Sequence, residues 1–182
     1  MAADKMHDSE FHLRPFAGSI PYAVGGNIRR TGSRVEVLFR VTGQCEDIRV
    51  QNPGIGPQRR DRLWQGTCFE VFVKEATASA YWEFNLAPGG DWNLYAFSGY
   101  RRGMMEETRV ADLPMTTTRG GGLLQVAATI DLGLLGLQEA ELRLALSAVI
   151  LDRQGGLRYW ALAHPADKPD FHNDKGFQLH LV

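Results

Sequence analysis

The stretch that decides the fold runs from Tyr81 to Phe97 and reads YWEFNLAPGGDWNLYAF. Its first six residues alternate between apolar and polar side chains, which is the two-residue period of a β-strand. Pro88-Gly89-Gly90-Asp91 has the composition of a tight turn, and Trp92–Phe97 then returns as a second strand. The segment therefore predicts a β-hairpin.

The same alternation extends outward in both directions along the chain. Further strands are predicted at 34–41, 47–51, 67–74, 114–119, 123–130, 141–151, 157–163 and 176–182. The residues from 52 to 63 read as a long polar loop, and those from 131 to 136 as one short helical turn that Asp131 caps. Residues 141–151 are apolar on both faces, which suits a central strand covered on both sides, with a helix as the alternative. We expect an all-β protein, an antiparallel β-sandwich of jelly-roll type with about nine or ten strands and very little helix.

Length and composition indicate one domain spanning residues 1–182, with residues 1–18 as an N-terminal extension or first edge strand. The net charge of −1 and the lack of a basic stripe argue against nucleic-acid binding. No apolar run is long enough to span a bilayer, and the N-terminus lacks the apolar region of a signal peptide. We therefore expect a cytoplasmic protein without a membrane partner, with Cys45 and Cys68 as thiols. Its oligomeric state has no signature in the sequence.

Three polar residues occupy mid-strand positions that usually carry apolar side chains. Glu70 lies within 67–74, and Glu83 and Asn85 lie on one face of the hairpin. One interpretation is that this face is exposed to solvent. The other is that the three residues form the floor of a shallow concave sheet, where carboxylates and amides would bind sugar hydroxyls. Glu70 and Glu83 could also form a glycosidase pair.

Aromatic residues and two loops are further candidates for binding. The aromatic residues near strand ends, which could stack on a ring, are Trp64, Trp92, Tyr95, Tyr100 and Trp160. The loop from His164 to Asp174 holds two His and three Asp, and reads as a solvated loop, a ligand-facing rim or a metal site. The basic run Arg59–Arg62 is interpreted as a solvated loop.

Three segments of the chain form a pattern together: LWQGTCFEVFV at 63–73, YWEFNLAPGGDW at 81–92 and PDFH at 169–172. In this order they resemble the DOMON-like domains, which are relatives of family 9 carbohydrate-binding modules. The resemblance implies a β-sandwich that binds a sugar or, in some members, haem. It assigns Trp64 as the stacking platform and Glu70 as the hydroxyl anchor, with Phe171 and His172 where relatives carry a second stacking Trp.

The resemblance also implies two cofactors. One is a structural calcium ion, for which no ligands can be assigned in this sequence. The other is haem, whose axial pair would come from Met104 or Met105 with His164 or His172.

The function that these observations favour is a non-catalytic module that binds a saccharide or a sugar-containing metabolite. Its site would comprise seven residues: Trp64, Glu70, Glu83, Asn85, Tyr95, Phe171 and His172. No catalytic residue is assigned. The alternatives are a haem-binding redox domain, a stand-alone enzyme using Glu70 with Glu83 or His172, and a protein-interaction domain without a small ligand.

Overall fold

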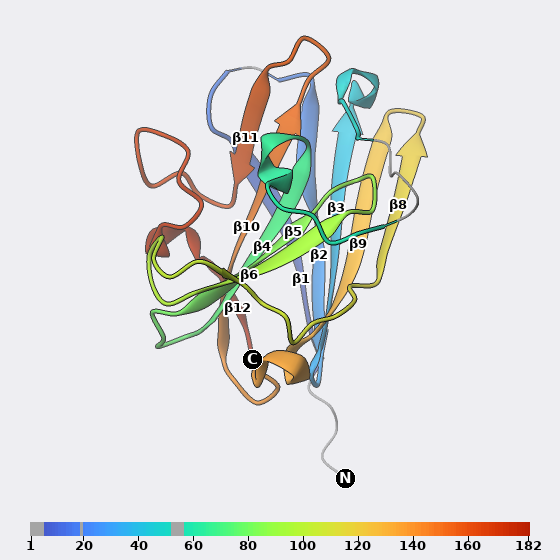
Figure 1. Cartoon of the computed structure of the whole chain (residues 1–182). Helices are drawn as coiled ribbons and strands as arrows, with labels where there is room; N and C mark the ends of the chain where they lie inside the picture. The colour runs from blue at the N-terminus through green and yellow to red at the C-terminus, as the bar shows by residue number, and fades with distance from the viewer. Residues whose placement is uncertain (1–5, 19, 52–56) are drawn as a thin grey trace.

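The computed structural model describes residues 6–18, 20–51 and 57–182, and it is all-β (Figure 1). The strands are β1 (Met6–Pro15), β2 (Tyr22–Thr31), β3 (Arg34–Gly43), β4 (Cys68–Glu75), β5 (Tyr81–Leu86), β6 (Trp92–Phe97), β7 (Met105–Glu106), β8 (Met115–Gly120), β9 (Leu123–Asp131), β10 (Leu142–Leu151), β11 (Leu157–Ala161) and β12 (Leu179–Leu181). Four short 3-10 turns connect them: η1 (Cys45–Asp47), η2 (Leu63–Gln65), η3 (Leu132–Leu135) and η4 (Asp174–Gly176).

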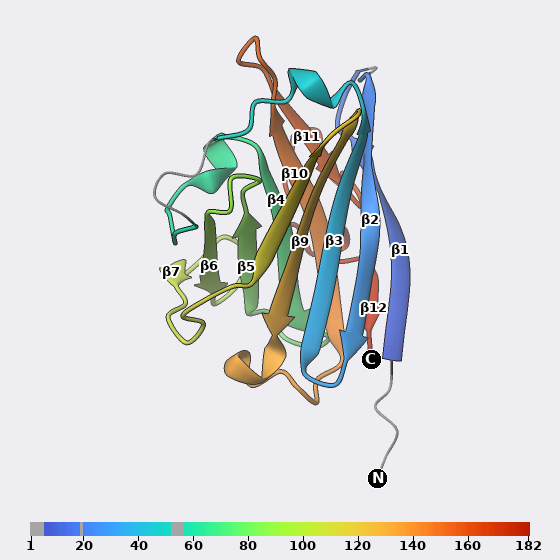
Figure 2. The same cartoon turned by 90° about the vertical axis from the view of Figure 1, so that its right-hand side faces the viewer.

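The strands form a single curled antiparallel sheet in the order β7-β6-β5-β4-β10-β11-β1-β2-β3-β9-β8, with β12 paired to β10. β1 joins the two halves because its residues 6–13 pair with β2 while Arg14 and Pro15 pair with β11. Figure 2 shows the two halves facing each other as the layers of a half-barrel. The predicted antiparallel β-sandwich class is confirmed, with twelve strands in place of nine or ten.

The main core fills the space between the two halves. Phe39 of β3 stacks on Phe69 of β4 with ring centroids 5.0 Å apart, which joins one layer to the other. Both rings are fully buried, as are Ile28, Phe84 and Leu124 around them. Alternate residues of each strand supply this core, as the two-residue period requires.

A second, smaller cluster covers the opposite face of the β6-β5-β4-β10 half. Its members are Phe72, Tyr81, Tyr95, Phe97, Ala145 and Phe177. β4 and β10 are therefore buried on both faces, which confirms β10 as a central strand and rules out the helical alternative. The segment that follows β11 lies over this second cluster and shields it from solvent.

Most predicted strands are confirmed, and β5 and β6 match their predicted bounds. The helical turn after β9 is also confirmed, since Gly133 N donates a hydrogen bond to Asp131 Oδ1 at 2.9 Å. The strand predicted at 47–51 is wrong, because η1 occupies its start and only Ile48 forms an isolated bridge there. Part of the loop predicted at 52–63 lies outside the described residues.

The sequence did not predict β2 or β7. The N-terminal segment forms β1, whose residues 6–13 pair with β2 and whose Arg14 and Pro15 pair with β11, and the extension or first edge strand predicted for residues 1–18 stays a prediction. β2 escaped prediction because Gly25 and Gly26 interrupt its apolar pattern. These glycines permit close packing, since a Cβ at Gly26 would lie 1.8 Å from the carbonyl oxygen of Leu38.

Both cysteines are free and buried. Within the described ranges, no helix is long and apolar enough to span a bilayer.

Candidate functional site

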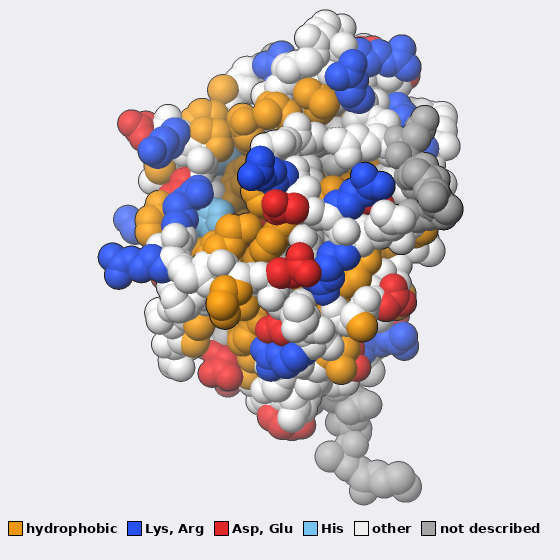
Figure 3. All heavy atoms as spheres, in the orientation of Figure 1, with side chains coloured by type: hydrophobic (Ala, Val, Ile, Leu, Met, Phe, Trp, Pro, Cys, Tyr) orange, Lys and Arg blue, Asp and Glu red, His pale blue; other side chains and the backbone are white. Residues whose placement is uncertain are grey.

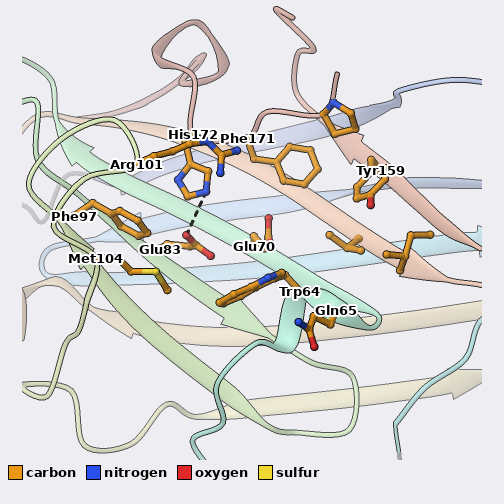
Figure 4. Close-up of a pocket in the computed structure, with 13 residues that line it drawn as sticks. Trp64, Gln65, Glu70, Glu83, Phe97, Arg101, Met104, Tyr159, Phe171 and His172 are labelled. Atoms are coloured by element: carbon orange, nitrogen blue, oxygen red, sulfur yellow. Dashed lines mark ion pairs between the residues drawn. The ribbon is translucent and has the colours of Figure 1, made fainter. Parts of the chain in front are cut away.

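A pocket of about 500 Å³ opens on the face of β4, β5 and β10 that points away from the main core, beneath the loop that follows β11 (Figure 4). It is lined by Trp64, Gln65, Glu70, Glu83, Phe97, Arg101, Met104, Val149, Leu157, Tyr159, Pro169, Phe171 and His172. Figure 3 shows a hollow on the face seen in Figure 1, with hydrophobic side chains and a histidine within it. The volume is typical of a small-molecule site.

The pocket floor, formed by Glu70 and Glu83, lies over a row of polar residues that crosses four paired strands. Ser147 of β10 lies opposite Glu70 of β4, Glu70 opposite Asn85 of β5, and Asn85 opposite Asn93 of β6. Glu83 is two residues from Asn85 and so lies diagonally from Glu70 on the same face. Strand register, which the sequence alone does not give, thus brings the two carboxylates together.

Both carboxylates are buried yet reach the pocket, with Glu70 only 3% and Glu83 only 4% exposed. Ser147 Oγ donates to Glu70 Oε2 at 2.6 Å, and Asn85 Nδ2 donates to Glu83 Oε1 at 2.7 Å. Burial raises the pKa of both groups, and the charge of Glu83 raises the pKa of Glu70 further. The pair therefore retains a proton at a higher pH than free carboxylates do.

His172 lies at the edge of the floor as a neutral imidazole. Burial, together with the charge of Arg101, lowers the pKa of His172 to about 4. Tyr81 Oη accepts the backbone N–H of Arg101 at 3.2 Å and lies 2.8 Å from His172 Nδ1. With the Tyr81 hydroxyl as the donor to Nδ1, the neutral ring carries its proton on Nε2, which faces Glu83 Oε2 at 3.9 Å.

The rim of the pocket is an ion pair between two loops. Asp170 is buried and accepts from Tyr100 Oη at 2.7 Å and from Arg101 Nη2 at 2.9 Å and Nε at 3.3 Å. Arg101 has φ of 52°, a left-handed conformation that is uncommon outside glycine. The rim therefore ties the loop after β6 to the loop after β11.

Trp64 forms the aromatic wall on the side of η2 (Figure 4). Arg62 precedes the turn with φ of 59°, and its backbone N–H donates to Asp61 Oδ1. The same oxygen accepts from Tyr95 Oη at 2.6 Å, and the ring of Tyr95 packs edge-on against Trp64 with centroids 5.7 Å apart. The position of Trp64 is thus fixed from below by β6.

Phe171 and Tyr159 form the wall on the other side, with Glu70 between them and Trp64 in Figure 4. Their ring centroids lie 6.2 Å apart. Tyr159 faces the pocket because it alternates in β11 with Trp160, which is buried in the main core. An aromatic wall on each side of a hydrogen-bonding floor can hold a ring-shaped ligand that carries hydroxyl groups.

Of the seven predicted site residues, five line the pocket: Trp64, Glu70, Glu83, Phe171 and His172. Asn85 and Tyr95 lie behind this lining, where Asn85 orients Glu83 and Tyr95 supports Trp64.

The pocket also contains residues that sequence reasoning missed, of which Arg101 and Tyr159 matter most. No sequence pattern pointed to Arg101, because its place depends on a turn conformation. The alternation of β11 did point to Tyr159, because it places the Tyr159 side chain on the opposite face of the sheet from that of Trp160.

Other candidates turn out to have structural roles. Trp92 and Trp160 belong to the main core. Arg59 is not simply solvated, since its guanidinium lies 4.3 Å from the Trp92 ring centroid and donates to Asn93 Oδ1 at 2.7 Å. The solvated-loop interpretation was wrong for Arg59 because its charge is satisfied by packing against β6.

The metal and haem hypotheses gain little from the geometry. Over the part of the chain that the structure describes, no three His, Cys, Asp or Glu side chains gather in a way that could hold a metal ion. His164 Nε2 lies 2.8 Å from the carbonyl oxygen of Arg14, and His172 Nδ1 is engaged by Tyr81. Met104 lines the pocket together with His172, but Nε2 of that histidine faces Glu83.

Comparison with solved structures shows the same fold in carbohydrate-related proteins. A candidate carbohydrate-binding protein from Bacteroides uniformis superposes with a TM-score of 0.68 at 11% identity, covering 92% of this chain and 84% of that one. A family 9 carbohydrate-binding module from Caldicellulosiruptor kristjanssonii, solved with cellotriose, gives a TM-score of 0.52 at 12% identity over 85% and 72%. No protein-family model and no curated protein matches the chain. At this identity the likeness establishes the fold, and it confirms the structural resemblance predicted from the sequence.

Proposed function

We propose that this protein is a non-catalytic binding module whose pocket takes a saccharide or a sugar-containing metabolite. The observation that carries the proposal is the combination of buried carboxylates on the floor with aromatic rings on both walls. The fold is shared with a module solved with cellotriose, which supports the same class of ligand. The pocket volume of about 500 Å³ suits one or two sugar rings.

Each part of the pocket has a defined role in this proposal. Trp64 stacks on one face of the sugar ring, and Phe171 closes the other side. Glu70 and Glu83 bind hydroxyl groups, since a carboxylate accepts hydrogen bonds and its protonated form also donates one. His172 Nε2–H donates to a further hydroxyl.

The test is a titration of the whole protein with mono- and disaccharides, followed by tryptophan fluorescence and calorimetry. Trp64→Ala and Glu70→Ala are each expected to weaken binding of the best sugar by about tenfold or more, which corresponds to about 1.4 kcal/mol. Leu134→Ala is the matched control, because Leu134 is exposed and lies outside the pocket. Unchanged affinity in both pocket variants, or no binding of any sugar by the wild type, would contradict the proposal.

A glycoside hydrolase is the second candidate, because Glu70 and Glu83 pair a proton-retaining carboxyl with a carboxylate partner. Both groups, however, arise from one floor, whereas a hydrolase places its two carboxyl groups on either side of the scissile bond. Nitrophenyl glycosides distinguish the candidates. Turnover that disappears in Glu70→Gln would identify an enzyme, and binding without turnover supports the module.

A further inference from the structure

The pocket floor has two acidic side chains and no basic side chain of its own among the lining residues. Glu70 and Glu83 are the acidic residues there, and the guanidinium of Arg101 is the nearest full positive charge among the lining residues. Arg101 already forms an ion pair with Asp170, which takes both its Nε–H and an Nη2–H. The rim pair is therefore close to neutral. Among the described residues no lysine or arginine forms an ion pair with Glu70 or Glu83, and the charge of Arg101 acts on them only from the rim.

Each floor carboxylate also has one oxygen without a hydrogen-bond donor among the described residues. Glu70 Oε2 is bound by Ser147 and Glu83 Oε1 by Asn85, which leaves Glu70 Oε1 and Glu83 Oε2 for a ligand. His172 Nε2 lies 3.9 Å from Glu83 Oε2, beyond hydrogen-bond distance. A buried carboxylate of this kind requires a proton or a cation nearby.

The walls favour the cation. Trp64, Phe97, Tyr159 and Phe171 surround the floor, and the faces of aromatic rings attract positive charge. Two buried carboxylates that can each accept a charge-assisted hydrogen bond, with aromatic rings beside them, can hold an ammonium group. A neutral sugar leaves the pair dependent on the proton that it retains, whereas an ammonium group can take the place of that proton.

We propose, building on the saccharide-binding function above, that the pocket selects an amino sugar whose ammonium group lies between Glu70 and Glu83. The ring of the sugar stacks on Trp64, and the ammonium group donates to Glu70 Oε1 and Glu83 Oε2. The hydroxyl groups face Arg101 and His172 at the rim.

This arrangement couples binding to proton release. The groups that face the two carboxylates are Ser147 of β10, Cys68 of β4, Asn85 and Tyr81 of β5, Arg101 of the loop after β6, and Asp170 and His172 of the loop after β11. His172 is neutral near pH 7 and Arg101 is balanced by Asp170, so the proton that an entering ammonium displaces comes from the carboxylate pair.

The experiment compares glucosamine, glucose and N-acetylglucosamine by calorimetry at pH 7 in two buffers of different ionisation enthalpy. Glucosamine is expected to bind at least about tenfold more tightly than the two neutral sugars, with release of protons to the buffer. Glu70→Gln and Glu83→Gln are expected to bring the ratio of the glucosamine and glucose dissociation constants close to one. Glu75→Gln, at the exposed end of β4, is the matched control and keeps the wild-type ratio.

The outcomes separate this inference from the function on which it rests. Glucose binding as tightly as glucosamine, or a ratio that both Gln variants leave unchanged, overturns the amino-sugar preference and leaves saccharide binding standing. Failure of all three sugars and of the saccharides titrated above to bind overturns both.

Discussion

At the scale of single residues, Glu70 and Glu83 make the folded protein sensitive to pH. Their pKa values are raised in the folded state, mainly by burial, so the folded protein holds protons that the unfolded chain releases. The contribution of this pair to stability is therefore most favourable below the ordinary glutamate pKa, near 4.5, and falls as pH rises from there through neutrality until the folded pair itself ionises. The two carboxylates lower stability above that pH, a cost that is common for groups with the binding role proposed here.

Glu70→Gln is expected to stabilise the protein at pH 8 and to have little effect at pH 4.5. The amide keeps an acceptor for Ser147 Oγ and removes the buried charge, a gain on the order of 1–2 kcal/mol at the higher pH. For a chain of this size that is a rise in Tm of about 2–8 °C. Thermal unfolding followed by circular dichroism at both pH values measures it. Glu75→Gln is the control on the same strand, and an equal effect of Glu70→Gln at the two pH values would contradict the buried-charge argument.

Asp170 has the opposite pH dependence. Burial disfavours its ionised form, but the hydrogen bonds from Tyr100 and Arg101 outweigh burial, and the pKa of Asp170 is lowered. Its stabilising contribution is present above the ordinary aspartate pKa and is lost as pH falls through the lowered value.

Asp170→Asn is expected to lower the free energy of unfolding at pH 7 by about 1–3 kcal/mol, because it weakens three charge-assisted hydrogen bonds. Denaturant unfolding at pH 7 and pH 3 tests this, and the difference from wild type shrinks at the lower pH. Asp167→Asn, exposed in the same loop, serves as control. A variant as stable as this control at pH 7 would show that the rim pair contributes nothing.

At the scale of elements, β6 supports the turn that carries Trp64. Tyr95 Oη donates to Asp61 and accepts from Asn93 Nδ2 at 2.8 Å, and it links the sheet to η2.

Tyr95→Phe keeps the ring packing but removes both hydrogen bonds. We expect a loss of about 1–2 kcal/mol in unfolding free energy and a several-fold weaker affinity for sugar, although Tyr95 does not line the pocket. Chemical denaturation and sugar titration measure the two effects. The control, Tyr100→Phe, removes a hydroxyl that binds Asp170 at the rim, so it leaves η2 unaffected. Equal Trp64 fluorescence spectra in Tyr95→Phe and wild type would argue against the link.

Elements with clean alternation could be predicted from the sequence, and those shaped by contacts could not. β5 and β6 carry an uninterrupted pattern and a clear turn, so their bounds were predicted correctly. β2 was missed because two glycines that make room for neighbouring strands remove its apolar signal. Glu70 and Glu83 could be chosen because a mid-strand carboxylate is unusual, whereas their proximity depends on register and the role of Arg101 on a positive φ.

At the scale of the whole molecule, β1 determines whether the two halves of the sheet form one curved layer. It bridges β2 and β11, and the ring of Phe11 occupies the space above Gly26, where a Cβ would lie 2.8 Å from its Cζ. Phe11 also packs edge-on against Phe39 at 5.3 Å, and Phe39 stacks on Phe69 of the other half. The three rings form a continuous line from β1 through the main core to the strand that carries Glu70.

Phe11→Ala is therefore expected to destabilise the whole molecule and not only its N-terminal strand. Removing a buried phenylalanine side chain typically costs about 3–5 kcal/mol, which is a large part of the stability of a single domain. Phe11→Leu retains most of the buried surface and should lose less, which keeps the test informative if the alanine variant does not fold.

The matched control is His12→Ala, because His12 is exposed on the same strand. Unfolding of the variants is followed both by far-ultraviolet circular dichroism and by the stabilisation that the proposed sugar ligand is expected to give. If β1 closes the sheet, the two signals move to lower temperature together, because the pocket strands lose their packing when the core opens. A loss of strand signal with the pocket still binding sugar at the wild-type temperature would show that β1 is an independent appendage.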